Sequence, residues 1–397
     1  MLCNTNDPVE IFEQLNAYQA VTIDSDNSID LDDAFWVRQC EDGCFELLVF
    51  ITNTSKVINR ESRHYLLAKD RVISTYHAKG LRDPMLSMNV TEKLSLNEAK
   101  GHDVIVFDIK VSANGESMLQ AVTQGKADNI CRLNYQLEQK DGVPDVSAML
   151  ESAQMCASIL FEQRLKRGSV AFADLDNGFY CNEEGVLIDV ELDDIHAQIM
   201  IQEFMIATNS LFAEYAKEAE LPIIYRNHSA PKAIGQREDF ITELINLYLA
   251  SPNSRITGSA MPRALYNTFS RGHFGLDLPS YATVTSPIRR FADLHNMIIL
   301  NNHLSNLPNQ TTEESVCDSI NTRLDELRDS KSTHLKSRDE GRALRKFNTK
   351  GSDLTATDLK FVVKSLPEGA KANKLTVAIS EFLKNTPSTE LIRAVWV

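Results

Sequence analysis

The chain of 397 residues is long enough for one large domain or two ordinary ones, and its 43% hydrophobic content allows a sizeable core. It has no run of about 18 apolar residues, no basic leader or apolar signal region at its N-terminus, and no CxxC pair among its seven cysteines, which together predict a cytoplasmic protein with reduced thiols and no membrane span. The net charge of −14 is unusual for a nucleic-acid-binding protein, but an acidic chain can still line one channel with Lys and Arg.

The first predicted element is a short amphipathic helix over residues 8–18. Val9, Phe12, Leu15 and Tyr18 recur there at roughly helical spacing. We therefore assign residues 1–19 to an N-terminal extension.

A dense acidic motif follows, in which five Asp residues crowd into ten positions between two apolar segments of β type. The five are Asp24, Asp26, Asp30, Asp32 and Asp33. Carboxylates at such close range repel one another, so the motif needs either solvation or a divalent cation, and hard Mg²⁺ or Mn²⁺ suits carboxylate oxygen.

Two other interpretations of this motif compete with a metal site. An EF-hand loop would need Gly and Glu where Ile29 and Phe35 stand, so it fits poorly. A solvated acidic turn is the simpler alternative, because runs of charge usually face water. The flanking β-type segments, residues 21–23 and 34–37, argue against it, since they would hold idle charge against a core.

The spacing of the motif resembles the catalytic signature of the RNB nuclease domain of ribonuclease II and ribonuclease R. The match uses Asp24, Asp30, Asp32 and Asp33 and leaves Asp26 outside. The resemblance implies an α+β fold with a mixed sheet and surrounding helices. It also implies 3′→5′ exoribonuclease activity that hydrolyses single-stranded RNA to nucleoside 5′-monophosphates, with two Mg²⁺ or Mn²⁺ ions held by the four carboxylates.

Two hairpins are predicted after the motif. The first joins residues 34–37 to 45–52 around Asp42-Gly43, and the second joins residues 104–111 to 118–122. The first hairpin leads into Asn53, where the family commonly has Asp. This departure affects metal binding or local hydrogen bonding at that position.

Four residues are candidates for RNA contact because they stand in segments that resemble the family's motifs in the same order. Tyr76 and Phe172 would bracket stacked bases, and Tyr135 with Glu203 would position the 3′-terminal nucleotide. For each Tyr taken alone, packing into the core is the alternative. Glu203 falls in a helix predicted over residues 193–219 with much of its surface buried, so its carboxylate needs a partner or a purpose.

Two further motifs precede the C-terminal region. His228, in a Tyr-Arg-x-His-x-x-Pro turn like that of the family, is interpreted as a structural, hydrogen-bonded residue. Ser286-Pro287 predicts a helix start, which places Arg289 in the first turn. A cation there opposes the helix dipole unless an anion is bound, or the Arg pairs with a nearby carboxylate. The resemblance implies that Arg289 helps to hold the scissile phosphate.

Helices are also predicted over residues 145–166 and 311–347, and the pattern stays helical from 355 to 397. The resemblance covers residues 20–348 as the catalytic domain and leaves residues 352–397 as a helical C-terminal extension. Family members usually carry cold-shock barrels before this domain and an OB-fold after it, and we expect both to be missing here. The extension could then serve a protein partner or self-association.

Two functions remain open from the sequence. The first is a Mg²⁺-dependent exoribonuclease with Asp33 as its most sensitive residue. The alternative is an RNB-like RNA-binding or regulatory protein without significant degradation activity.

Overall fold

The computed structural model describes residues 18–77, 80–98, 101–138, 145–174, 179–181, 187–189, 192–230, 262–349, 354–365 and 372–385. The chain divides into two compact units, Met1–Asn321 and Thr322–Val397. The predicted helix over residues 8–18 lies outside the described residues, apart from Tyr18. The domain limits inferred from the sequence stay predictions.

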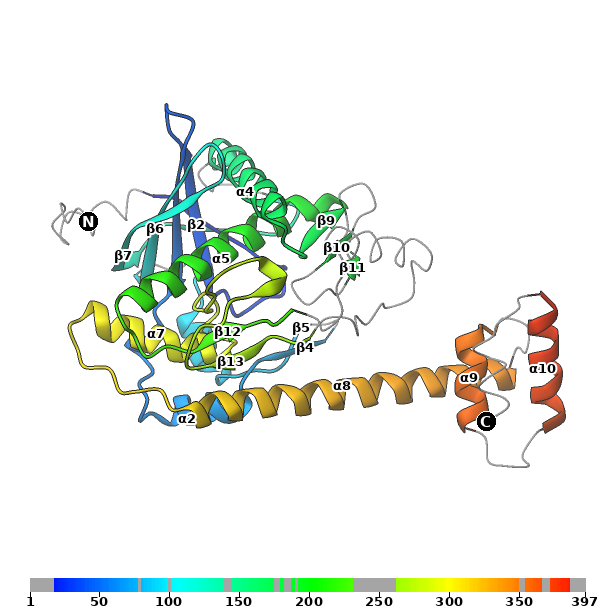
Figure 1. The fold of residues 1–397 in the computed structure, drawn as a ribbon. Coiled ribbons are helices and arrows are strands. Elements are labelled where there is room, and N and C mark those ends of the chain that lie inside the picture. Colours follow the sequence, from blue (N-terminus) through cyan, green and yellow to red (C-terminus); the bar gives the residue numbers. More distant parts are fainter. Residues whose placement is uncertain are drawn as a thin grey trace. The chain divides into compact units, whose positions relative to one another are not determined.

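The N-terminal unit is built on a six-stranded mixed sheet with the strand order β7-β6-β3-β2-β1-β8 (Figure 1). The strands are β1 (Ala20–Ile23), β2 (Asp33–Gln39), β3 (Phe45–Thr52), β6 (His102–Val111), β7 (Ser117–Ala127) and β8 (Ile130–Leu133). Neighbours are antiparallel except β1 and β8, which run parallel. Both predicted hairpins are confirmed, as β2–β3 and β6–β7.

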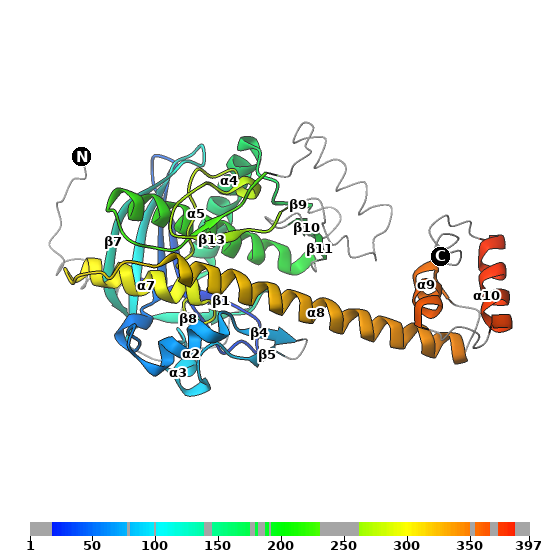
Figure 2. The ribbon, with the colours of Figure 1, turned by 60° about the horizontal axis from the view of Figure 1, so that its bottom comes forward.

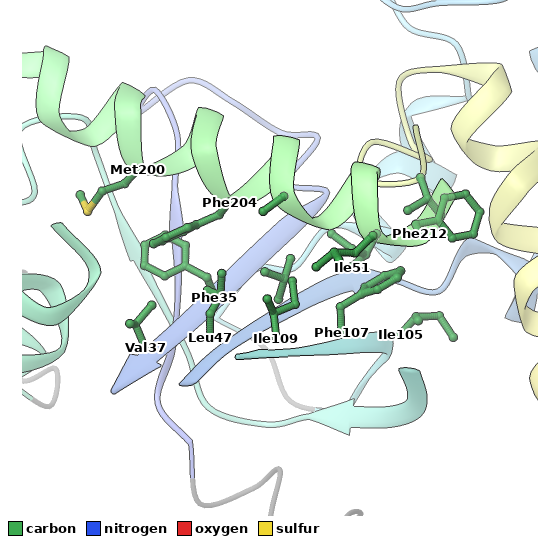
Figure 3. Close-up of a cluster of buried hydrophobic side chains, with 14 of the residues drawn as sticks. Phe35, Val37, Leu47, Ile51, Ile105, Phe107, Ile109, Met200, Phe204 and Phe212 are labelled. Atoms are coloured by element: carbon green, nitrogen blue, oxygen red, sulfur yellow. The ribbon is translucent and has the colours of Figure 1, made fainter. Parts of the chain in front are cut away.

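Two long helices, α4 (Ser147–Arg167) and α5 (Leu192–Glu218), cover one face of the sheet and confirm two predicted helices (Figure 1). Their apolar side chains meet every second residue of the strands, because side chains alternate between the two faces of a strand. Phe204 packs edge-on against Phe35 at 5.1 Å between ring centroids, and Phe212 packs similarly against Phe107 at 6.4 Å (Figure 3). These contacts fix the ends of the strands relative to α5.

Shorter elements complete the N-terminal unit, and α2, α3, β4 and β5 lie on the side away from α4 and α5 (Figure 2). Their bounds are η1 (Thr54–Lys56), α2 (Arg63–Arg71), β4 (Thr75–His77), β5 (Gly80–Asp83), α3 (Met88–Leu94), β9 (Phe172–Asp174), β10 (Phe179–Cys181), β11 (Leu187–Asp189), β12 (Tyr225–Asn227), β13 (Leu265–Asn267) and η2 (Phe274–Leu276). Mixed sheet and helices together confirm the predicted α+β class.

The buried helix α7 (Phe291–Leu304) corrects one prediction, because it begins at Phe291 and not at Ser286-Pro287. Residues 289–291 are drawn into backbone pairing with residues 72–74: Ser74 N donates to Arg289 O at 2.9 Å, and Phe291 N donates to Val72 O at 2.8 Å. Val72 itself has a φ of 66°, which a β-branched residue rarely adopts. Tertiary pairing therefore overrides the local capping signal.

The C-terminal unit consists of helices that pack around their own apolar cluster. The helices are α8 (Glu314–Thr349), α9 (Ala356–Ser365) and α10 (Ala372–Asn385), and the unit boundary falls within α8. Phe347, Leu359 and Val362 are buried in the cluster. The predicted helix over 311–347 is confirmed. The helical pattern predicted from 355 to 397 is confirmed over residues 356–365 and 372–385, while residues 366–371 and 386–397 lie outside the described part. A docking role for this region stays a prediction. Among the described residues, no helix is long and apolar enough to cross a membrane.

We predict that Phe204→Ala destabilises the protein by about 3–5 kcal/mol, because it removes a ring that is 0% exposed between α5 and the sheet. Urea unfolding followed by circular dichroism measures the change. Phe269→Ala is the matched control, since Phe269 is 44% exposed and should cost far less. Equal losses from the two variants would show that the α5–sheet contact is not a main source of stability.

Candidate active site

The acidic motif forms the connection between two neighbouring strands of the sheet, β1 and β2, and lies at one end of these strands. Asp24 directly follows β1, and Asp33 is the first residue of β2. Because β1 and β2 are antiparallel, with Val21 opposite Phe35, the end of β1 and the start of β2 lie side by side at the same end of the two strands. The carboxylates predicted from spacing alone are therefore brought together in space.

Hydrogen bonds to backbone atoms hold this connection in place. Arg132 from β8 donates to three of its carbonyl oxygens. Ser95 donates its hydroxyl to the Ile29 carbonyl and accepts from the Leu31 N–H at 3.0 Å. The Asp24 N–H donates to the Leu133 carbonyl at 3.2 Å, so the strand β8 is tied to the start of the loop.

The four matching Asp residues divide into two pairs by their contacts. Asp30 accepts a hydrogen bond from the Tyr76 hydroxyl. Asp32 is 1% exposed and accepts from the Ile288 N–H at 2.7 Å and from Arg289 Nε at 3.0 Å. The carboxylates of Asp24 and Asp33 have no hydrogen-bond donor among the described residues.

Burial and mutual repulsion make this cluster electrostatically unfavourable without a counter-ion. Burial, then the charge of Asp33, raises the pKa of Asp24 to about 7. Burial raises the pKa of Asp33 to about 6, although Arg289 and Arg290 oppose the shift. Burial likewise raises the pKa of Asp32, against the pull of Arg289 and the Ile288 N–H. At neutral pH a cation beside Asp24 and Asp33 would relieve the repulsion.

Arg289 lies in the turn before α7, so its predicted place in the first turn of a helix was wrong. The alternative, pairing with a carboxylate, is confirmed by its ion pair with Asp32. Its side chain is still 41% exposed, and only Nε is used within the described part of the chain. The terminal nitrogens are thus available to an anion.

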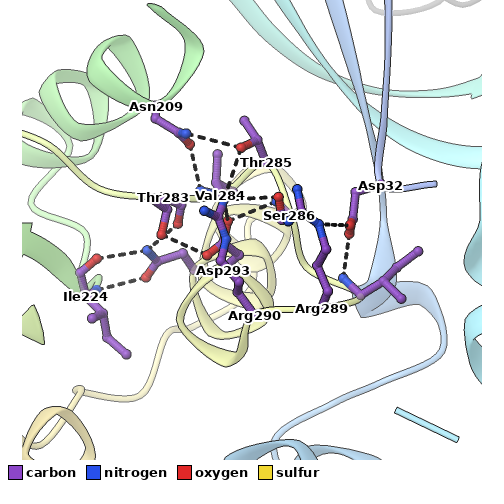
Figure 4. A network of polar contacts seen from close by, with 12 residues as sticks. Asp32, Asn209, Ile224, Thr283, Val284, Thr285, Ser286, Arg289, Arg290 and Asp293 are labelled. Atoms are coloured by element: carbon purple, nitrogen blue, oxygen red, sulfur yellow. Dashed lines mark hydrogen bonds and ion pairs between the residues drawn. The ribbon is translucent and has the colours of Figure 1, made fainter. Parts of the chain in front are cut away.

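A buried polar network holds the turn that carries Arg289 (Figure 4). Asp293 accepts from the Thr283 hydroxyl at 2.7 Å, the Ser286 N–H at 2.9 Å and Arg290 Nη2 at 2.7 Å. Asn209 on α5 accepts from the Val284 N–H at 2.9 Å. Because these groups pair with one another and Asp293, Thr283, Ser286 and Asn209 are buried, the turn has a single well-defined position.

No role was predicted from the sequence for Asp293 or Asn209, nor for Asn296, which exchanges two hydrogen bonds with the backbone of Ile224. The available signal for Asp293 and Asn296 was their position among the apolar residues at the start of α7. Asn209 lies between Thr208 and Ser210, so its neighbours gave no such contrast.

The donor set suits a divalent ion that shares its ligands with water or substrate. Among the described residues, no group of three or more Asp, Glu, His or Cys side chains forms a complete protein cage for a metal. Mg²⁺, however, usually takes one or two carboxylates and completes its shell with water and phosphate oxygens. Asp24 and Asp33 offer that pair, because both are partly exposed and lack other donors among those residues.

Comparison with known proteins identifies the family of this chain. The family model described as the RNB domain matches residues 12–306. This chain belongs to the RNB-domain family. Ribonuclease R of Ureaplasma parvum is 26% identical over 322 residues, which cover 70% of this chain and 44% of that protein. The chain therefore spans less than half the length of this relative.

Solved structures support the same RNB fold. Mycoplasma genitalium RNase R in complex with ribose-methylated single-stranded RNA matches with a TM-score of 0.66 and 22% identity, covering 81% of this chain and 57% of that one. Yeast Ssd1, described as a pseudonuclease, matches with a TM-score of 0.55 and 18% identity, covering 77% and 42%.

The predicted RNA-contact residues of this RNB domain have different surroundings. Tyr76 on β4 is 48% exposed, and its hydroxyl joins it to the acidic cluster through Asp30. Tyr135 follows β8 and is partly buried against the main core. Phe172 opens β9, opposite Cys181 on β10, and its side chain lies outside the described part. The structure thus brings Tyr76 to the cluster.

Glu203 has the partner that its buried position in the predicted helix required. Its carboxylate is 2% exposed and accepts from Arg164, whose Nε and Nη2 donate to it at 3.0 and 2.6 Å. Arg164 also donates to Ser169 at 2.7 Å. The pair neutralises a buried Arg, and the contact of Glu203 with a terminal nucleotide stays a prediction.

Two other residues of the RNB motifs are structural. Asn53 donates to Asn301 on α7 at 2.9 Å and accepts from the Ser55 hydroxyl, so it ties β3 to a helix. His228 accepts from the Gly275 N–H at 3.0 Å through Nδ1 and donates through Nε2 to the Pro262 carbonyl at 2.7 Å. This confirms the structural interpretation of His228.

We predict that the metal-free protein loses stability as pH rises from about 5 to about 8. The pKa values of Asp24 and Asp33, about 7 and about 6, are raised above their unfolded values, so the folded state binds more protons in this range and unfolding becomes easier as they ionise. Thermal unfolding in EDTA measures the trend. Asp24→Asn should flatten it, and Asp26→Asn, at an exposed position in the same loop, should not. The same pH slope in all three proteins would contradict the assignment.

Proposed function

We propose that this RNB domain is a metal-dependent 3′→5′ exoribonuclease that hydrolyses single-stranded RNA to nucleoside 5′-monophosphates. The observation that carries the proposal is the exposed end of Arg289, fixed by Asp32 within electrostatic reach of Asp24 and Asp33. A phosphodiester at this position would meet a guanidinium on one side and carboxylates able to hold a cation on the other. The substrate class follows the single-stranded RNA in the similar RNase R complex.

The proposed cofactor is Mg²⁺ or Mn²⁺, with two ions during catalysis. Asp24 and Asp33 would hold the first ion. Asp30 and Asp32 would contribute to a second while keeping their donors Tyr76 and Arg289, because a carboxylate can accept several contacts at once. When bound, such ions lower the pKa of water and neutralise the leaving oxygen.

The chain's own groups perform the remaining steps. Asp32 holds Arg289 by its Nε, so the terminal nitrogens face outward and can donate two parallel hydrogen bonds to phosphate oxygens. Tyr76 presents an aromatic face beside the cluster, and its bond to Asp30 limits the rotation of the ring. A base stacked there would be held without regard to its identity, as a nuclease of broad sequence range requires.

The cellular location that we propose is the cytoplasm. Five cysteines in the described part of the chain carry free thiols, namely Cys40, Cys44, Cys131, Cys156 and Cys317. Free thiols are the usual state in a reducing compartment.

The second candidate function is RNA binding without degradation. The observation in its favour is the likeness to yeast Ssd1, a protein described as a pseudonuclease that has the same fold. The four Asp residues and Arg289 favour the nuclease, since a protein that only binds RNA has no need of crowded carboxylates that repel phosphate.

We predict that the wild-type protein shortens a 5′-labelled single-stranded RNA in Mg²⁺ and not in EDTA, and that Asp33→Asn reduces the rate by at least about a hundredfold with RNA affinity nearly unchanged. Gel electrophoresis of the labelled products and fluorescence anisotropy measure rate and affinity. Asp26→Asn is the control and should remain active, because Asp26 is not one of the four Asp residues that match the RNB signature. Hydrolysis that persists in EDTA would falsify the metal mechanism, and binding without any hydrolysis by the wild type would establish the second candidate.

We also predict that Arg289→Ala and Arg290→Ala separate catalysis from folding. Arg289→Ala should lower kcat by about 10²–10³-fold, because its free end serves the phosphate, and should also lower Tm, because it leaves the buried Asp32 without its ion pair. Arg290→Ala should lower Tm with a much smaller loss of kcat, because it removes the ion pair of the buried Asp293. If the two variants lose activity and stability in the same proportion, Arg289 has no special role in the reaction.

A further inference from the structure

The acidic loop has an arginine that binds its backbone and none of its carboxylates. Arg132 stands on β8 opposite Thr22 of β1, in the parallel register of these two strands. Its Nη2 donates to the carbonyl oxygens of Ser25 at 3.0 Å, Asp26 at 3.0 Å and Ser28 at 2.9 Å. Three acceptors on one amino group require the loop to curl around it.

This curl lies between two of the motif's carboxylates. The Ser28 N–H closes it by donating to the Ser25 carbonyl at 2.9 Å, and the hydroxyls of Ser25 and Ser28 lie 2.9 Å apart. Asp24 directly precedes this curl in the sequence, and Asp30 follows it. Arg132 from another strand therefore holds the part of the loop between Asp24 and Asp30, while Ser95 holds residues 29–31.

We propose that Arg132 is a positioning residue that holds the acidic loop in the conformation in which Asp24 and Asp33 share a divalent cation. The inference rests on the proposed function, since it concerns the same metal site. Arg132 touches neither the cation nor the substrate, and it acts through the carbonyl groups that fix the loop.

The two physical effects of removing Arg132 have opposite signs, and this makes the role testable. Loss of a positive charge near Asp24 would by itself strengthen cation binding, because one repulsive interaction disappears. Loss of the curl would weaken it, because the two carboxylates must then be reordered for each binding event. Groups that orient metal ligands typically contribute about 10–100-fold in affinity, so the second effect should exceed the first.

The test measures Mn²⁺ binding to the full chain without RNA, by electron paramagnetic resonance. We expect Arg132→Ala to raise the Mn²⁺ dissociation constant by about tenfold or more. In the nuclease assay it should lower the rate at limiting Mg²⁺ and leave the KM for RNA unchanged, with recovery at high Mg²⁺. Arg38→Ala is the control, since Arg38 is exposed on β2 and pairs with Glu46 away from the loop.

Arg132→Met serves if the Ala variant does not fold. Methionine keeps much of the length of the side chain but has no N–H donor for the three carbonyl groups, so Mn²⁺ binding should again weaken. Tighter or unchanged Mn²⁺ binding in folded Arg132→Met or Arg132→Ala would overturn the inference. If the wild type itself binds no Mn²⁺, the proposed metal-dependent function fails instead, which separates the two conclusions.

Discussion

The ion pair between Asp32 and Arg289 is the contact on which the rest of the site depends, because it joins two motifs that lie 257 residues apart. Asp32 also accepts the Ile288 N–H, so one buried carboxylate holds both the backbone and the side chain of the turn before α7. A buried charge is costly unless it is paired and hydrogen-bonded, and here both conditions are met. The pairing in turn decides which end of Arg289 remains free.

This contact also explains why the four Asp residues are not equivalent. Asp32 and Asp30 accept from Arg289 and Tyr76, whereas Asp24 and Asp33 have no donor in the described part of the chain, and the charge of Asp33 raises the pKa of Asp24. Arg289 lowers the pKa of both free carboxyls but does not offset their burial. The fold therefore maintains an electrostatic strain at one edge of the sheet, which a cation would relieve.

The sequence was informative where local pattern and tertiary structure agree. Apolar β-type segments on either side of turn residues predicted the hairpins β2–β3 and β6–β7, and Asp42-Gly43 marked the first turn. The start of α7 could not be read in this way, because Ser286-Pro287 is a good capping pair that loses to backbone pairing with residues 72–74. Pairing between segments that are distant in the sequence cannot be predicted from the residues of one short stretch.

Glu203 and Asn53 show a second limit, which is that a motif position does not reveal its partner. Glu203 sits where the family resemblance implied a nucleotide contact, yet Arg164 reaches it from the neighbouring helix α4. Asn53 stands where the resemblance implied an Asp, and the sequence left a change in metal binding or in local hydrogen bonding open; its amide binds Asn301 on α7. In both cases the sequence identified a buried polar group that needed a partner, and only the packing of helices against the sheet determined which one.

The net charge of −14 can now be related to the site itself. Arg132 donates to three carbonyl groups, Arg290 pairs with Asp293, and Arg164 pairs with Glu203. The charged groups of these three arginines therefore already have partners within the protein. Arg289 alone of the four keeps an exposed end beside the acidic cluster. A scissile phosphate at this position would be repelled by the carboxylates, and a bound cation would offset that repulsion at the reacting group while Arg289 binds the phosphate from the other side.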